Sequence, residues 1–235
     1  MSPKIKIDTL IVSDIHLGAK ASQAKNLVNF LKTHTFKRLI ILGDFLDNSY
    51  FSKVRSDDSG IISLIRELAS SKDRYEVIWV RGNHDKEVDG IISHALGLKQ
   101  SDQYAWEHNG KRYLAVHGDQ FDHLMERTNK AHAWIHYLYL FVQNFDRSGR
   151  HLVKIIDLSN ATLRKLSGKV SDGAIRYAKE QKAEYIFCGH THIAMKKTHT
   201  DEYSTVKYYN VGCWTHTPST FAAIDDNNNV FLEKF

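Results

Sequence analysis

Short motifs rich in histidine and aspartate follow five apolar runs of this sequence. The runs are "IDTLIVS", "RLIIL", "YEVIWV", "RYLAV" and "EYIFC", and the motifs behind them are "DIH", "GDFLD", "GNHD", "HGD" and "GHTH". Imidazole, carboxylate and amide groups are ligands for divalent cations such as Mn²⁺, Fe, Zn²⁺ or Co²⁺, and no thiolate occurs in the motifs. A single pair of this kind is more often a turn than a site. Five in series, each behind an apolar run, favour a metal centre.

The candidate ligands are expected to meet in space. Binding sites of α/β sheets form beyond the carboxyl ends of strands, which is where these motifs fall. Residues two apart in an extended chain point to the same side, so each pair in "DIH" and "HTH" can face one site. The candidates are two aspartates, one asparagine and four histidines: Asp14, His16, Asp44, Asn83, His117, His190 and His192. This number of ligands is too large for one ion and suits two.

The elements that must position these motifs alternate along the chain. Strands are expected over 7–13, 38–42, 75–80, 112–116 and 184–188, and helices over 22–34, 56–71 and 87–98. Such alternation predicts an α/β protein with largely parallel inner strands. Three further strands, over 205–212, 219–225 and 229–235, predict a second, more antiparallel sheet. The expected fold is one domain over 1–235, in which two mixed β-sheets pack as a sandwich flanked by helices.

No strand is expected over about 121–182. Apolar residues recur at helical spacing from Phe121 to Phe145, and the stretch "HLVKIIDLSNATLRKLSG" continues the helical pattern with basic residues. We predict a helical insertion, or cap, within the domain. Its apolar and basic surface would suit acyl chains, a membrane face or another subunit, and plain packing on the core is the alternative.

The composition is that of an ordinary globular protein. Hydrophobic residues make up 42% and charged residues 25% of the 235 residues, and the net charge is +5. The basic excess suits an anionic partner, although a solvated basic surface explains it equally well. No nucleic-acid partner is expected, because no basic and aromatic strand surface is evident. The N-terminal run is expected to be a first strand and not a signal peptide. Cys188 and Cys213 are expected to be small buried residues in a reducing, cytoplasmic compartment.

Taken together, the five motifs resemble those of the calcineurin-like metallophosphoesterase superfamily. The resemblance covers nearly the whole chain and implies a phosphodiester or pyrophosphate hydrolase with two divalent ions, Mn²⁺ first and Fe, Zn²⁺, Co²⁺ or Mg²⁺ as alternatives. It implies attack by a hydroxide that bridges the two ions. The implied ligands of one ion are Asp14, His16 and His192, those of the other are Asn83, His117 and His190, and Asp44 bridges them.

Two residues beside Asn83 are candidate catalytic groups. His84 is placed to donate a hydrogen bond to a phosphate oxygen or to protonate the leaving group. Asp85 is expected to orient His84, and a role at the start of a helix is the equally good alternative.

Other residues are candidates for substrate contact. Arg81 is expected to contact phosphate or to pair with an acid. His123 is a candidate to face the metals from the insertion, although packing within the insertion suits most of the remaining histidines. Trp214 is a candidate for a wall of the pocket, although core packing suits it better. Asp47 and Asp119 are candidates for supporting the ligands from behind, although a surface or turn role suits each of them better.

The length, the helical stretch after "HGD" and the segment "GCWTHTPSTFA" after "GHTH" resemble the branch of UDP-2,3-diacylglucosamine hydrolases in lipid A synthesis. That branch splits a pyrophosphate, releases UMP and lipid X, and works at the inner membrane face. The resemblance therefore implies a lipid-linked nucleotide substrate and a peripheral membrane contact. His84 stands where that branch typically carries arginine, so a different phosphate-containing substrate is the first alternative. A non-catalytic scaffold on the same fold is an alternative of another class.

Overall fold

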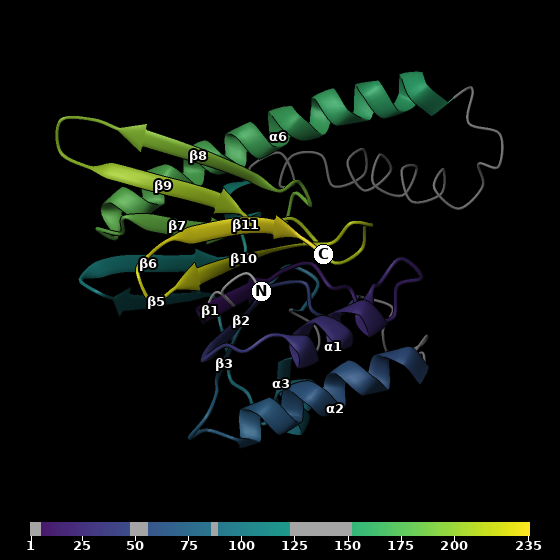
Figure 1. Ribbon diagram of the computed structural model, residues 1–235. Coiled ribbons are helices and arrows are strands. Elements are labelled where there is room, and N and C mark those ends of the chain that lie inside the picture. The colour runs from purple at the N-terminus through teal and green to yellow at the C-terminus, as the bar shows by residue number, and fades with distance from the viewer. Residues whose placement is uncertain (1–5, 48–55, 86–88, 123–151) are drawn as a thin grey trace, which may run out of the picture.

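Two β-sheets packed face to face form the centre of the protein (Figure 1). The computed structural model describes residues 6–47, 56–85, 89–122 and 152–235. Within them the first sheet has the strand order β11-β10-β1-β2-β3-β4, and the second has the order β5-β6-β7-β9-β8. The strands are β1 (Ile7–Val12), β2 (Arg38–Leu42), β3 (Glu76–Val80), β4 (Gln100–Ser101), β5 (Gln103–His108), β6 (Lys111–Val116), β7 (Tyr185–Cys188), β8 (Met195–Thr200), β9 (Thr205–Asn210), β10 (Thr220–Asp225) and β11 (Val230–Lys234).

Helices cover the outer faces of both sheets. The described helices are α1 (Ala24–Thr33), α2 (Ser56–Ser70), α3 (Asp89–Leu96), the 3₁₀ turn η2 (Asp119–Phe121) and α6 (Leu152–Glu180). Figure 1 shows α1, α2 and α3 on the side of the first sheet and α6 along the second. The predicted sandwich of two mixed sheets flanked by helices is confirmed.

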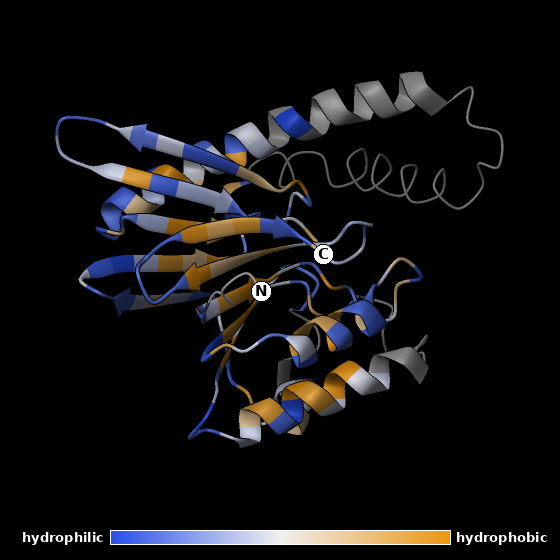
Figure 2. Ribbon diagram, viewed as in Figure 1, coloured by the Kyte–Doolittle hydropathy of each residue, from blue (hydrophilic) through white to orange (hydrophobic). Residues whose placement is uncertain are grey.

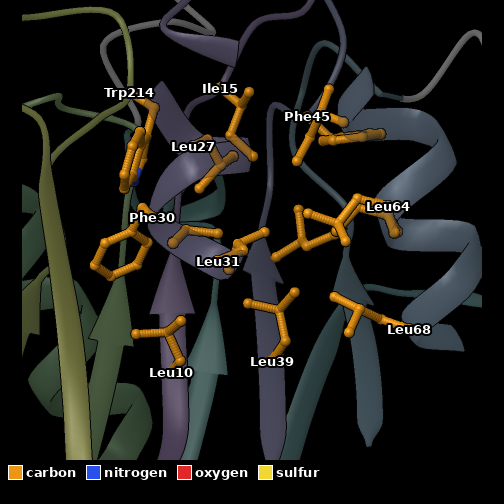
Figure 3. Packing of buried hydrophobic residues seen from close by; sticks show 14 of the residues in the cluster. Leu10, Ile15, Leu27, Phe30, Leu31, Leu39, Phe45, Leu64, Leu68 and Trp214 are labelled. Atoms are coloured by element: carbon orange, nitrogen blue, oxygen red, sulfur yellow. The ribbon is translucent and has the colours of Figure 1, made fainter. Parts of the chain in front are cut away.

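Continuous apolar runs form the inner strands because both of their faces are covered. In β1, Leu10 packs with the helices and Ile11 packs between the sheets, and Leu39 and Ile40 repeat this division in β2. Figure 3 shows Leu10 below Phe30 and Leu39 below Leu31, both of α1, and Figure 2 shows the apolar colour on the inner strands and on α1 and α2. Burying each such side chain stabilises the fold by roughly 1.5–3 kcal/mol.

Small residues let α6 approach the second sheet. Ala174 and Ala178 pack against Ile186 of β7 with no exposed surface on any of the three. At the residue directly before Ala174, a Cβ atom on Gly173 would lie 2.9 Å from Cβ of Phe121 in η2. The helix is therefore held against the segment that follows the "HGD" motif.

Two predictions about the strands are wrong in detail. β10 and β11 do not join a second sheet with β9, because β10 pairs antiparallel with β1 and extends the first sheet. Strands β4, β5 and β8 were not expected. All three lie at sheet edges, and in β8 every second residue is exposed, so its sequence "MKKTHT" lacks an apolar run.

The expected insertion over 121–182 falls partly on 123–151, which lies outside the described residues. From Leu152 to Glu180 the chain forms the single helix α6, consistent with the helical pattern there. Among the described residues, no helix combines the length and the apolar character needed to cross a bilayer.

Candidate metal centre

The five motifs lie together because their strands run parallel. β1, β2 and β3 are parallel neighbours in one sheet, and β6 and β7 are parallel neighbours in the other. Backbone hydrogen bonds join the loops behind them: the Asp14 amide donates to Gly43 O at 3.1 Å, and the Gly189 amide donates to His117 O at 2.9 Å. The His190 amide donates to Oδ2 of Asp14, which joins the loops of one sheet to those of the other.

Five of the seven candidate ligands have left-handed backbone conformations. The φ values are +52° at Asp14, +48° at His16, +48° at Asp44, +67° at His190 and +58° at His192. Residues other than glycine rarely adopt this backbone conformation, because it costs roughly 1–2 kcal/mol per residue. Such strain gathers at functional sites, where the surrounding structure enforces it.

Because glycine has no side chain, Gly82 and Gly189 let the carboxylates of two candidate ligands approach the backbone. A Cβ atom on Gly82 would overlap Oδ1 of Asp44, and a Cβ atom on Gly189 would overlap Ser13 and Oδ2 of Asp14. The backbone amides that follow are close enough to bind these carboxylates: His84 N donates to Asp44 Oδ1 at 2.9 Å, and His190 N donates to Asp14 Oδ2 at 3.0 Å.

The first group of ligand atoms comes from "DIH" and from the second histidine of "GHTH". Nε2 of His192 lies 3.1 Å from Oδ1 of Asp14 and 3.3 Å from Nε2 of His16. One ligand atom from each of the three residues lies within 4.8 Å of the other two, a spacing that a single cation can span.

Asp44 lies between this group and the histidine of "HGD". Its Oδ2 atom is 3.6 Å from Nε2 of His16 and 3.4 Å from Nε2 of His117. Asp14, Asp44 and His117 form a further group of close ligand atoms. The side chain of His84 completes the rim, with Nε2 3.9 Å from the same Asp44 oxygen.

His190 adjoins the His117 side of the cluster, and Asn83 directly precedes His84, whose backbone amide donates to Asp44. The rings of His117 and His190 lie 5.3 Å apart between centroids. Oδ1 of Asn83 is buried with no hydrogen-bond partner in the described structure. The sequence therefore brings all seven candidate ligands to the same set of loops.

Buried polar atoms without hydrogen-bond partners indicate that the candidate ligands fit divalent cations. Nδ1 of His117 lies 3.1 Å from Leu42 O and donates to it, so Nε2 is the nitrogen directed into the cluster. That Nε2 atom and Asn83 Oδ1 are buried and have no hydrogen bond within the described part of the chain. A buried polar atom without a partner is costly, and a cation would supply one to both.

Two buried carboxylates give the cluster its electrostatic character. Burial alone would raise the pKa of Asp14, but His192 lowers it to about 2. His117 similarly holds the pKa of Asp44 well below its usual range. In return, and against the effect of burial, Asp44 raises the pKa of His117 to about 10, and Asp14 raises the pKa of His192. The site therefore demands positive charge, which either protons or metal ions can supply.

Two candidate ligand imidazoles also have carboxylate neighbours outside the groups described above. Nε2 of His190 lies 3.2 Å from Oδ2 of Asp122, and Nδ1 of His16 lies 3.8 Å from Oδ2 of Asp47. Such contacts fix the orientation of an imidazole ligand. Asp47 was a candidate for this role. Asp122 was missed, and its only sequence signal is an aspartate five residues after the histidine of "HGD".

Cys213 and His216 were also missed as neighbours of the cluster. One ligand atom from each lies within 4.8 Å of the other and of a ring nitrogen of His192. Burial alone would raise the pKa of the Cys213 thiol, but hydrogen bonds with His192 and His216 lower it to about 5. The expectation that Cys213 is a small buried residue holds, because it is 3% exposed, yet its surroundings are polar.

Asp85 does not orient His84. Its carboxylate accepts hydrogen bonds from the backbone amides of Gly82 at 2.9 Å and Leu46 at 3.1 Å, with Nε1 of Trp79 at 3.4 Å. Burial and the nearby charge of Asp44 raise the pKa of Asp85 to about 6. Asp85 therefore ties two ligand loops together.

The residues expected to contact substrate do not gather at the cluster. Arg81 pairs with the carboxylate of Asp102 through Nε at 3.0 Å, which is the alternative given for it. Trp214 is fully buried and packs 5.3 Å from the ring of Phe30, so it is a core residue and not a pocket wall (Figure 3). His123 lies outside the described residues.

The fold and the site define a class of protein: a phosphoester hydrolase of the metallophosphoesterase fold. The sequence model of the calcineurin-like phosphoesterases matches residues 7–194, and the chain belongs to that family. Members hold divalent metal ions, and this chain is accordingly a metal-dependent phosphoesterase that acts on a phosphate-containing substrate.

Known proteins resemble the chain over almost its full length. The UDP-2,3-diacylglucosamine hydrolases of two Coxiella burnetii strains, RSA 331 and RSA 493, are each 28% identical to it over 240 residues, covering 94% of this chain and 95% of theirs. A solved archaeal phosphodiesterase superimposes with a TM-score of 0.50 at 14% identity, over 97% of this chain and 99% of its own. That structural likeness supports the fold alone.

Proposed function

We propose that this chain hydrolyses the pyrophosphate bond of UDP-2,3-diacylglucosamine or of a closely related lipid-linked nucleotide. The observation that supports this substrate is the 28% identity to UDP-2,3-diacylglucosamine hydrolases, which extends over nearly all of both chains. The net charge of +5 suits a substrate that carries two phosphates.

We assign the ligands to two cations, with Mn²⁺ as the proposed metal. Asp14, His16 and His192 would hold the first ion, Asn83, His117 and His190 would hold the second, and Asp44 would contact both. Oxygen and imidazole donors suit Mn²⁺. When bound, such ions polarise phosphate oxygens and lower the pKa of water toward neutrality.

The protein's own groups would hold the reacting phosphate in place. The carboxylate of Asp44 is fixed by the His84 amide at 2.9 Å, so it keeps its place between the two groups of ligands. The His84 side chain is 27% exposed and lies at the rim, with its ring centroid 4.9 Å from that of His16. From there the imidazole can donate a hydrogen bond to a phosphate oxygen or give a proton to the departing phosphate.

The proposed substrate is tested by phosphorus NMR of the Mn²⁺-loaded protein with UDP-2,3-diacylglucosamine. We expect resonances of UMP and of the acylated sugar phosphate to replace those of the pyrophosphate. The matched control is Asp44→Asn, which keeps the shape of the side chain and removes its charge. Hydrolysis of bis-p-nitrophenyl phosphate without UMP formation would retain the phosphoesterase and refute the lipid substrate.

The role of His84 is tested by a pH–rate profile of His84→Ala against the parent. A general acid contributes typically 10²–10⁴-fold, and its loss removes the basic limb of the profile. A basic limb that is unchanged in the variant would leave His84 as a hydrogen-bond donor only.

A further inference from the structure

A second group of metal-ligating side chains adjoins His192 on the side away from the hydrolytic cluster. The group consists of His192, Cys213 and His216, and one ligand atom of each lies within 4.8 Å of the other two. The hydrolytic cluster uses only oxygen and imidazole donors. This group adds a sulfur donor, and thiolate with imidazole is the set that selects Zn²⁺ over Mn²⁺ or Mg²⁺.

The two ring nitrogens of His192 face different partners. Nε2 lies 3.1 Å from Oδ1 of Asp14, within the hydrolytic cluster. Nδ1 lies 3.5 Å from Oγ1 of Thr215, in the loop between β9 and β10 that also carries Cys213 and His216. The two nitrogens of an imidazole diverge, so Nδ1 is the atom that His192 offers to this loop.

Hydrogen bonds hold that loop in a fixed shape. The Cys213 amide donates to Oγ1 of Thr220 at 3.2 Å, the Thr220 amide donates to Cys213 O at 3.3 Å, and Oγ of Ser219 donates to His216 O at 3.1 Å. Gly212 has a φ of +80°, and a Cβ atom there would overlap Thr220. The spacing between Cys213 and His216 is thus set before any cation binds.

Trp214 anchors the loop to the hydrolytic cluster. Its amide donates to Asp14 O at 3.0 Å, and its carbonyl oxygen accepts from the Gln23 amide at 2.8 Å. Its side chain is buried against Phe30, as Figure 3 shows. Cys213 and His216, on either side of this anchor, therefore keep a constant position relative to His192.

A cation can reach the group from the surface. Cys213 is 3% exposed, but His216 is half-buried, and the next residues, Thr217 and Pro218, are exposed among the described residues. His216 would be the first ligand that an incoming ion meets, and Cys213 would close the site from within.

We propose that Cys213, His216 and Nδ1 of His192 form a Zn²⁺ site that shares His192 with the hydrolytic centre. The sharing rests on the proposed role of His192 in hydrolysis, whereas the site itself rests on the loop geometry. Zn²⁺ at Nδ1 would displace the ring proton to solvent and weaken the electron-pair donation from Nε2, which lies 3.1 Å from Asp14 in the hydrolytic centre. Excess Zn²⁺ therefore inhibits the Mn²⁺-loaded enzyme.

The site is tested with Co²⁺, a coloured substitute for Zn²⁺, added to the Mn²⁺-saturated full chain. We expect a thiolate-to-cobalt charge-transfer absorption that saturates at about one equivalent and disappears when Zn²⁺ is added. Cys213→Ser should abolish the absorption and His216→Ala should weaken the binding at least about tenfold. Cys188→Ala is the matched control, because Cys188 is the other buried free cysteine and lies outside this group.

Absence of the absorption in the parent, or its persistence in Cys213→Ser, overturns the proposal. If Cys213→Ser does not fold, as judged by circular dichroism, His216→Ala at the half-buried position decides the matter. The absorption does not require turnover, so a failure of the proposed hydrolysis would not remove it. Zinc inhibition that weakens about tenfold or more in His216→Ala would support the shared histidine.

Discussion

Replacing Gly189 with alanine tests whether close backbone approach builds the metal centre. The backbone at Gly189 does not need a positive φ, so alanine adopts its conformation without strain. The new Cβ atom would instead overlap Ser13 Oγ and Asp14 Oδ2, and would lie 3.0 Å from Ser13 Cβ. The substitution therefore displaces one ligand carboxylate and leaves the ligand residues themselves unchanged.

The backbone at Gly189 cannot move away to relieve this overlap. Its amide donates to His117 O at 2.9 Å, and its carbonyl oxygen accepts from Nδ2 of Asn210 at 2.6 Å. Overpacking of this kind costs about 1–3 kcal/mol of stability. Displacing groups that orient a ligand lowers metal affinity about 10- to 100-fold, which equals about 1.4–2.7 kcal/mol.

Metal affinity would be measured by calorimetric titration of Mn²⁺ into the ion-free protein, and stability by thermal unfolding with a chelator present. Gly168→Ala is the matched control, because a Cβ atom there meets no atom within 4 Å and lies in helix α6. The control should bind Mn²⁺ as the parent does and should be stabilised by up to about 1 kcal/mol. Parent-like Mn²⁺ binding in Gly189→Ala would refute the placement of Asp14 as a ligand held by this glycine.

Three further outcomes follow from the site and the core. Mn²⁺ affinity should rise with pH up to about 10, because the pKa of His117 is raised to about 10 and that of His192 is raised. The His117 imidazole is therefore protonated at neutral pH and must release its proton to bind, which contributes about tenfold per pH unit; pH-independent calorimetric affinities would contradict this. Asp85→Ala should lower the free energy of unfolding, measured in urea, by about 2–4 kcal/mol, because the buried amides of Gly82 and Leu46 lose their acceptor. A loss below about 0.5 kcal/mol would contradict the role of Asp85 in joining the two loops. Trp214→Ala should destabilise by about 3–5 kcal/mol with an unchanged KM, whereas a raised KM in folded protein would restore Trp214 as a pocket residue.

Much of the fold was readable from local sequence. The inner strands are continuous apolar runs because they are covered on both faces, and this pattern predicted β1, β2, β3, β6 and β7 near their observed bounds. The edge strands β5 and β8 were missed, since their exposed faces carry polar residues. The pairing of β10 with β1 was also missed, because strand order depends on contacts between distant parts of the chain.

The candidate ligands were predictable for the same reason. Each of the five motifs follows a strand, so the sequence by itself determined which side chains reach the loops behind the strands. It also determined, through Gly82 and Gly189, that the backbone can pass close to two carboxylates.

What surrounds the ligands was decided only by the tertiary structure. Asp122 contacts His190, which lies 68 residues further along the chain. Cys213 and His216 lie near His192 but belong to the loop between β9 and β10. Asp85 joins two loops and is not a partner of His84, and the burial of Trp214 selects core packing over the pocket wall. In each case the side chain's neighbours come from remote segments, and no local pattern of residue types encodes a contact that forms only when those segments pack together.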